Sequence, residues 1–142
     1  MVKTRNEIAG IYRIAYPDLE EHYCIIMSEE LLIPSFDKIV FWANKYATTD
    51  IPFKKNIADC EKHSWFFINA IHKERAIKSI DTKKGYTLAT GWLTGIKYGL
   101  IGETPHTIVT ALTDKGIKNI EPRTNVIEGV DITDFNALLL VM

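Results

Sequence analysis

The chain has 142 residues, of which 46% are hydrophobic and 25% are charged, and its formal charge is -1. These values are typical of one globular domain and exclude a strongly basic nucleic-acid-binding surface. No segment approaches the roughly 18 apolar residues of a membrane-spanning helix, and the first residues lack the apolar core of a signal peptide. We therefore expect a single cytoplasmic domain over residues 1–142, with no nucleic-acid or membrane partner. The sequence does not indicate the oligomeric state.

Helices are predicted for the first part of the chain. Thr4 and Glu7 have the spacing of a capping box before an apolar segment. Residues 28–32 predict a short helical turn. Ser35 is a predicted N-cap for a helix over 36–46, where apolar residues recur at helical spacing.

A third helix is predicted to begin near Asp59, whose side chain can accept hydrogen bonds from the first backbone N–H groups. Cys60, Phe67 and Ile71 then share one face of this helix. The thiol would lie near the positive end of the helix dipole, which stabilises a thiolate. Cys24, in an apolar segment, is predicted to be a core residue instead.

Beyond Gly85 the segments are short, β-branched or apolar, and separated by turn residues. The sequence TDKG at 113–116 predicts a hairpin between the strands on either side. Helices over about 1–80 followed by strands over about 85–142 predict an α+β fold, with N-terminal helices packed on a C-terminal antiparallel sheet.

The predicted hairpin also carries candidate functional residues. His106 and Glu121 lie at nearly equal distances from its turn, so antiparallel pairing would bring them together. If Cys60 faces this pair, the three side chains make an activated nucleophile, with His106 as base and Glu121 as the residue that orients it. A Cys, a His and a Glu in this order also occur in many proteins, so purely structural roles stay open.

The motifs Asp59-Cys60-Glu61, His106 and Glu121-Pro122-Arg123 resemble those of papain-like cysteine proteases. Proteins of this kind occur in phages and bacteria and in the protease domain of the Marasmius-type fungal agglutinin. The resemblance implies a papain-like fold and a thiol hydrolase, most simply a cysteine peptidase, acting on a protein or peptide substrate. Two alternatives stay open: acyl transfer of the transglutaminase or deamidase type, and an inactive papain-fold binding protein that occupies a host factor.

The resemblance implies no organic cofactor. It suggests calcium near the start of the third helix, but Lys62 stands where the family has an acid, so we expect no calcium requirement. Asn56 is a candidate side-chain donor to an oxyanion, or alternatively a turn residue before the helix. His63 is an alternative base. A metal site from Cys60, His63 and His106 lacks a fourth ligand, so none is predicted.

Overall fold

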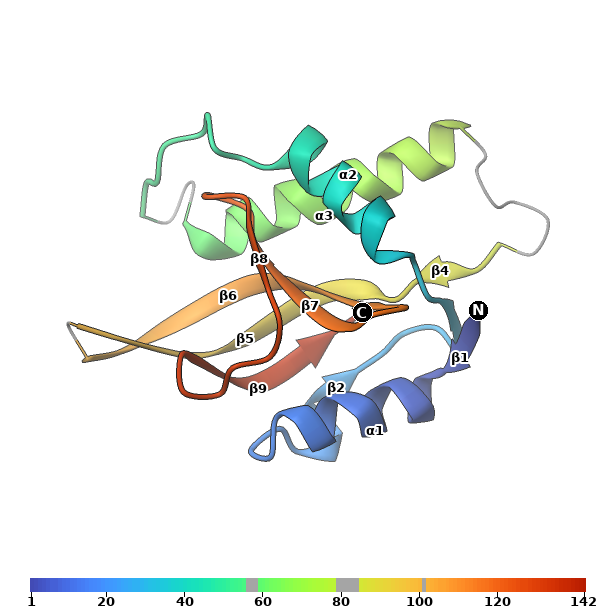
Figure 1. Cartoon of the computed structure of the whole chain (residues 1–142), viewed down its shortest axis with the longest axis horizontal. Helices are drawn as coiled ribbons and strands as arrows, with labels where there is room; N and C mark the ends of the chain where they lie inside the picture. The colour runs from blue at the N-terminus through green and yellow to red at the C-terminus, as the bar shows by residue number, and fades with distance from the viewer. Residues whose placement is uncertain (56–58, 79–84, 101) are drawn as a thin grey trace.

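The computed structural model describes residues 1–55, 59–78, 85–100 and 102–142. Three α-helices and two β-sheets are present among them (Figure 1). The helices are α1 (Arg5–Ala15), α2 (Phe36–Tyr46) and α3 (Cys60–Lys78), with a short 3-10 helix at Glu21–Tyr23. The strands are β1 (Val2–Thr4), β2 (Cys24–Ile25), β3 (Glu30–Leu32), β4 (Thr87–Leu88), β5 (Thr90–Gly99), β6 (Gly102–Thr113), β7 (Gly116–Glu121), β8 (Val126–Glu128) and β9 (Phe135–Val141).

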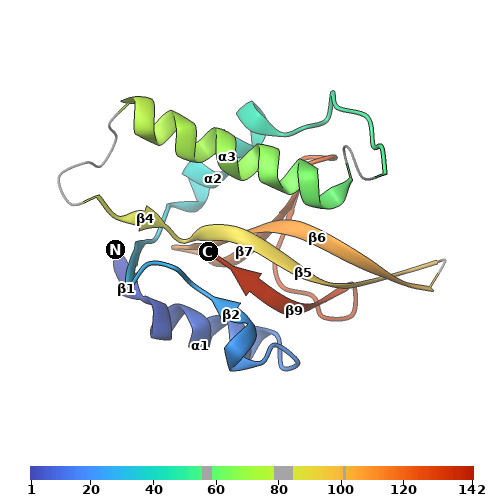
Figure 2. The ribbon, with the colours of Figure 1, turned by 180° about the vertical axis from the view of Figure 1, so that it is seen from behind.

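The larger sheet has the strand order β2-β9-β5-β6-β7-β8, and the smaller one has the order β1-β3-β4. Helices α2 and α3 cover one face of the larger sheet, whereas α1 lies on the opposite side (Figures 1 and 2). The long antiparallel pair of β5 and β6 forms the middle of this three-layer arrangement.

Strand β6 contributes to a hydrophobic core on each side of the sheet. Ile108 and Leu112 belong to the core shared with α1, whereas Val109 and Ala111 belong to the core shared with α2 and α3. Successive side chains of a strand point to opposite faces, so a strand covered on both sides reads as a continuous apolar run. This explains the run IVTAL in the sequence.

The predicted helix starts are confirmed. Thr4 and Glu7 form the capping box of α1, and Ser35 Oγ accepts the backbone N–H of Lys38 at the start of α2. Asp59 Oδ1 accepts the backbone N–H of Lys62 at 3.2 Å, which satisfies one of the free donors at the start of α3.

A buried polar network fixes α1 on the sheet. The hydroxyl oxygens of Tyr12 and Thr110 are 2.8 Å apart, and Thr110 donates to Asn119 Oδ1 at 2.9 Å. Asn119 Nδ2 in turn donates to the Tyr16 hydroxyl at 2.6 Å. Because buried polar groups are costly without partners, these bonds specify where the helix docks.

Strands β5 and β9 approach closely at a register shift between Thr94 and Gly95. A Cβ atom at Gly95 would overlap the backbone carbonyl oxygen of Asn136, and one at Gly91 would overlap that of Val141. Glycine is therefore required at both positions for this strand pairing.

The predicted fold class is wrong in its arrangement. Strands β1, β2 and β3 lie within the part predicted to be helical, and residues 28–32 include β3 rather than a helical turn. The sheets are also not purely antiparallel, since β2 pairs in parallel with β9 and β3 pairs in parallel with β4. Strands of two or three residues are too short to show a period of two, so sequence patterning misses them.

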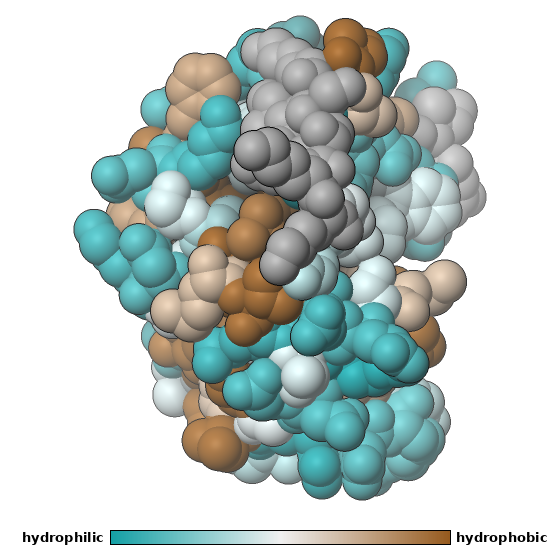
Figure 3. All heavy atoms as spheres, turned by 90° about the vertical axis from the view of Figure 1, so that its right-hand side faces the viewer, coloured by the Kyte–Doolittle hydropathy of each residue, from teal (hydrophilic) through white to brown (hydrophobic). Residues whose placement is uncertain are grey.

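None of the helices in the described part of the chain is both long and apolar enough to cross a membrane. The face shown in Figure 3 is largely hydrophilic, with hydrophobic patches interspersed among polar residues.

Candidate functional site

The candidate site forms where β6 extends beyond its partner β7. Strand β7 pairs with β6 from Val109 to Thr113 in the described residues, so the earlier part of β6 has an open edge on this side. His106 lies in this part of β6, and Glu121 is the last residue of β7. Continuing the register places Glu121 opposite Ile108, which makes His106 its diagonal neighbour on the same face. The distance from His106 Nε2 to Glu121 Oε2 is 2.6 Å.

Cys60 approaches His106 from helix α3. It is the first residue of α3, and α3 is tied to β6 because Ser64 Oγ donates to the Thr107 carbonyl at 3.3 Å. Cys60 and His106 lie close enough to interact, since each side chain shifts the pKa of the other. Since Nε2 faces Glu121, Nδ1 is the ring nitrogen left for the thiol. The structure therefore brings Cys60, His106 and Glu121 together, with the imidazole between the thiol and the carboxylate.

The interactions among Cys60, His106 and Glu121 favour the charged forms of these side chains. The hydrogen bond with His106 lowers the pKa of Cys60 below its ordinary value, although burial opposes this. Burial alone would lower the pKa of His106, but its hydrogen bonds with Cys60 and Glu121 raise it to about 9. For Glu121, burial alone would raise the pKa, but the contact with His106 lowers it. These directions correspond to a thiolate–imidazolium pair beside a carboxylate.

A tight turn holds Glu121. The backbone N–H groups of Thr124 and Asn125 donate to its carbonyl at 3.2 and 2.8 Å, and the backbone N–H of Arg123 donates to Oε1 at 3.4 Å. Asn125 takes a φ of 60°, which asparagine adopts more readily than most residues. The carboxylate is therefore aimed at His106 by the backbone as well as by the ring.

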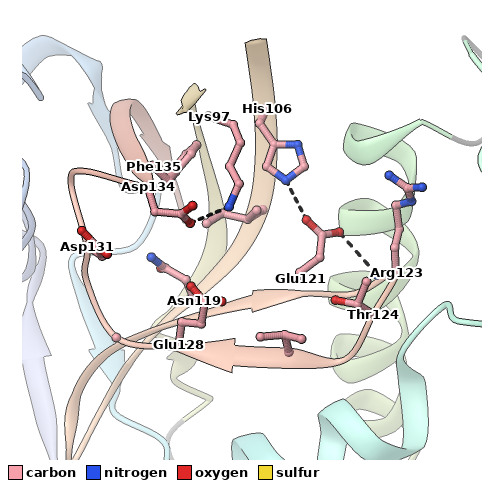
Figure 4. Close-up of a pocket in the computed structure, with 13 residues that line it drawn as sticks. Lys97, His106, Asn119, Glu121, Arg123, Thr124, Glu128, Asp131, Asp134 and Phe135 are labelled. Atoms are coloured by element: carbon pink, nitrogen blue, oxygen red, sulfur yellow. Dashed lines mark hydrogen bonds and ion pairs between the residues drawn. The ribbon is translucent and has the colours of Figure 1, made fainter. Parts of the chain in front are cut away.

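A cavity of about 340 Å³ adjoins His106 and Glu121 (Figure 4). Its apolar wall includes Ile108 and Phe135, and its polar wall includes Asn119. The charged groups Lys97 and Asp134 also line it, bound to each other at 2.5 Å. These residues were not predictable from the sequence, because they come from four separated segments and no local motif connects them.

The remaining predicted residues lie elsewhere. His63 is fully buried and its Nδ1 contacts the Thr48 hydroxyl, so it is not brought to the Cys60–His106 pair. Asn56, the candidate oxyanion donor, lies outside the described residues. Glu61 is paired with Lys62 at 3.4 Å, and in the described segments no group of three His, Cys, Asp or Glu side chains is placed to hold a metal ion.

The sequence matches no protein-family model and no curated protein, whereas solved structures do resemble the fold. One is described as a PSL1a–E64 complex, with a TM-score of 0.76, 17% sequence identity, and coverage of 97% of this chain and 49% of the other. A second is Polyporus squamosus lectin bound to the human-type influenza-binding epitope Neu5Acα2-6Galβ1-4GlcNAc, with a TM-score of 0.77, 18% identity, and coverage of 97% and 48%. The chain thus spans about half the length of these proteins.

These comparisons correct the predicted family and fold. The structures that resemble the chain are described as PSL1a and as a lectin, not as papain-like proteases, so the papain-like assignment and its phage and bacterial relatives are overturned. The physical reason is that the motifs are short and local. They specify a thiol at a helix start and two side chains on a hairpin, which are local features that do not determine the whole topology.

The predicted activity and partner are corrected with the family. The lectin structure holds a glycan epitope, not a peptide, which overturns the prediction of a peptidase acting on a protein or peptide substrate. The two alternatives, acyl transfer and an inactive papain-fold protein that occupies a host factor, rested on the same family and are overturned with it.

Proposed function

We propose that this chain presents Cys60 as a nucleophilic thiolate that captures an electrophilic ligand in a covalent bond. The observation that carries the proposal is the meeting of three side chains, in which Glu121 contacts His106 at 2.6 Å and His106 interacts with Cys60. A thiolate is the reactive form of cysteine, and a neighbouring imidazolium keeps the thiol ionised near neutral pH. Glu121 holds Nε2 of the ring and so leaves Nδ1 for the sulfur.

The expected reaction needs only these side chains. With an epoxide such as E64, the sulfur attacks a ring carbon, the carbon–oxygen bond breaks, and the oxygen takes the proton of the His106 imidazolium. With iodoacetamide, the sulfur displaces iodide. We therefore also propose that no metal or organic cofactor is required, so that EDTA leaves the rate of Cys60 alkylation unchanged. Because both cysteines are free thiols, a reducing compartment such as the cytoplasm suits the site.

Site-resolved alkylation tests the proposal, with Cys24 as the internal control. Burial raises the pKa of Cys24, whereas the pKa of Cys60 is lowered. One pKa unit changes the thiolate fraction about tenfold, so Cys60 should react with iodoacetamide at pH 7 at least about tenfold faster than Cys24. Peptide mass spectrometry assigns the label, and E64 should add to Cys60 alone. His106→Asn should slow Cys60 and leave Cys24 unchanged. Equal rates at the two cysteines in the folded protein would overturn the proposal.

Glycan binding is a second candidate, favoured by the lectin structure that resembles this fold. The cavity beside His106 is lined by the buried ring of Phe135 and by the exposed carboxylates of Glu128 and Asp131, and such carboxylates suit the hydroxyls of a sugar.

Calorimetry and NMR with Neu5Acα2-6Galβ1-4GlcNAc, and with Galβ1-4GlcNAc as the control without sialic acid, test this candidate. Binding should shift the Phe135 resonances, and Asp131→Asn should weaken it, whereas Glu29→Gln, at a residue that does not line the cavity, should not. Absence of heat and of shifts at millimolar glycan would refute glycan binding.

A further inference from the structure

His63 is a buried titratable residue that the proposed thiolate chemistry does not use. Its side chain is fully buried, one helical turn after Cys60 on α3. Nδ1 contacts the Thr48 hydroxyl, and Nε2 has no hydrogen-bond partner in the described part of the protein. Burying a polar ring with one nitrogen unpaired is unfavourable, and an apolar side chain would fill the same space without that cost. Among the described residues, the contact with Thr48 is thus the one polar interaction of the ring.

Thr48 connects α3 with the turn that carries Glu121. It is 4% exposed and uses every polar group it has. Its hydroxyl contacts His63, its carbonyl accepts the backbone N–H of Ile51 at 3.0 Å, and its backbone N–H donates to the Pro122 carbonyl at 2.8 Å. Pro122 directly follows Glu121. A path of two direct contacts therefore leads from the helix that carries Cys60 to the residue beside the carboxylate.

A second contact supports the same turn from α2. Asn125 Nδ2 donates to Asn44 Oδ1 at 2.9 Å, but this bond is exposed. Exposed hydrogen bonds compete with water and contribute little, so the buried contact through Thr48 is the stronger constraint.

We propose that His63 is a positioning residue for Glu121, acting through Thr48 and Pro122. This role rests on the proposed thiolate site. Helix α3 sets the position of the sulfur directly, and through His63 and the loop after α2 it also sets the position of the carboxylate. Small displacements of a hydrogen-bonded group change how well it supports its neighbour's charge. Without this link the turn can move relative to α3, Glu121 supports the His106 imidazolium less well, and the Cys60 thiolate is stabilised less.

Substitution of His63 itself risks unfolding, so Thr48 provides the test. Thr48→Val removes the hydroxyl and keeps the shape, whereas Thr48→Ser keeps the hydroxyl. Thr90→Val is the matched control, because Thr90 is also a buried threonine but its hydroxyl has no hydrogen-bond partner in the described residues. The readouts are the pH profile of Cys60 alkylation by iodoacetamide and the titration of the His106 ring by NMR.

Thr48→Val should move the alkylation profile of Cys60 to higher pH and slow the reaction at pH 6–7 about threefold or more, which corresponds to about half a pKa unit. Thr48→Ser should restore the wild-type profile, and Thr90→Val should leave it unchanged. A loss of thermal stability in Thr48→Val with an unshifted profile would overturn the positioning role. If Cys60 of the wild-type protein reacts no faster than Cys24, the thiolate proposal itself fails, which is a distinct result.

Discussion

His106 and Glu121 are fifteen positions apart in the sequence, yet their side chains meet at 2.6 Å across the open end of the β6–β7 hairpin. Both side chains are mostly buried, with 17% and 24% of their surface exposed. Partial burial strengthens such a charged hydrogen bond relative to an exposed ion pair. The pair therefore controls the charge of the imidazole, and its consequences can be measured directly.

Glu121→Gln should lower the pKa of His106 from about 9, because the neutral amide no longer stabilises the imidazolium. We expect a decrease of about one unit or more, measured from the NMR titration of the His106 ring protons. Glu128→Gln, which removes a carboxylate from the same cavity without touching the ring, is the matched control. An unchanged His106 titration in Glu121→Gln would contradict this electrostatic coupling.

The His106–Glu121 interaction should stabilise the fold most between about pH 4.5 and 6.5. The pKa of Glu121 is lowered from 4.5, so its contribution is complete above pH 4.5 and is lost as the pH falls below it. The pKa of His106 is raised from 6.5 to about 9, so its contribution is complete below pH 6.5 and is lost as the pH rises through 9. Urea unfolding of the wild type and Glu121→Gln from pH 3 to 9 gives the difference in unfolding free energy. A difference independent of pH would argue against this.

Asn119→Ala should destabilise the protein, since it leaves the buried hydroxyls of Tyr16 and Thr110 without their shared partner. Leaving buried polar groups unpaired costs about 1–3 kcal/mol, measurable by chemical denaturation. Asn44→Ala, which breaks the exposed bond to Asn125, serves as the control and should cost less than about 0.5 kcal/mol. Similar losses in the two variants would show that the network does not fix α1.

Gly95→Ala should lower the free energy of unfolding by about 3 kcal/mol or more, because the added Cβ would overlap the Asn136 carbonyl and force β5 and β9 apart. Gly10→Ala is the opposite case. Gly10 lies within α1 with open space around it, so alanine should raise the stability by about 0.5–1 kcal/mol. Thermal and urea unfolding distinguish the two, and a stable Gly95→Ala variant would disprove the close approach of these strands.

Local features of the fold were predictable from the sequence because their determinants are adjacent in the chain. The capping box of Thr4 and Glu7, the N-cap at Ser35 and the hairpin around residues 113–116 each depend on a few neighbouring residues, and the structure confirms them. The hairpin also allowed His106 and Glu121 to be considered together, since a turn and a register are enough to relate them.

The rest of the fold and site depends on contacts between distant segments. The pairing of β2 with β9 and the cavity formed by Lys97, Asn119 and Asp134 have no local pattern. His63 shows the same limit, since its spacing from Cys60 suggested a possible base, whereas its partner Thr48 comes from another segment. The family assignment failed for a related reason, because short motifs describe a site and not the topology around it.

The parallel pairing of β2 with β9 joins Cys24 to Leu140 and thus closes almost the whole chain into one loop. Long loops are costly to close, whereas the β5–β6 and β6–β7 hairpins close short ones. We therefore expect the hairpins and α3 to assemble early during folding, and the edge strand β2 to be added late. In this order of assembly, the segment containing Cys60 and His106 is organised before the two ends of the sheet are joined. Substitutions at Ile25 should therefore accelerate unfolding and leave the folding rate nearly unchanged.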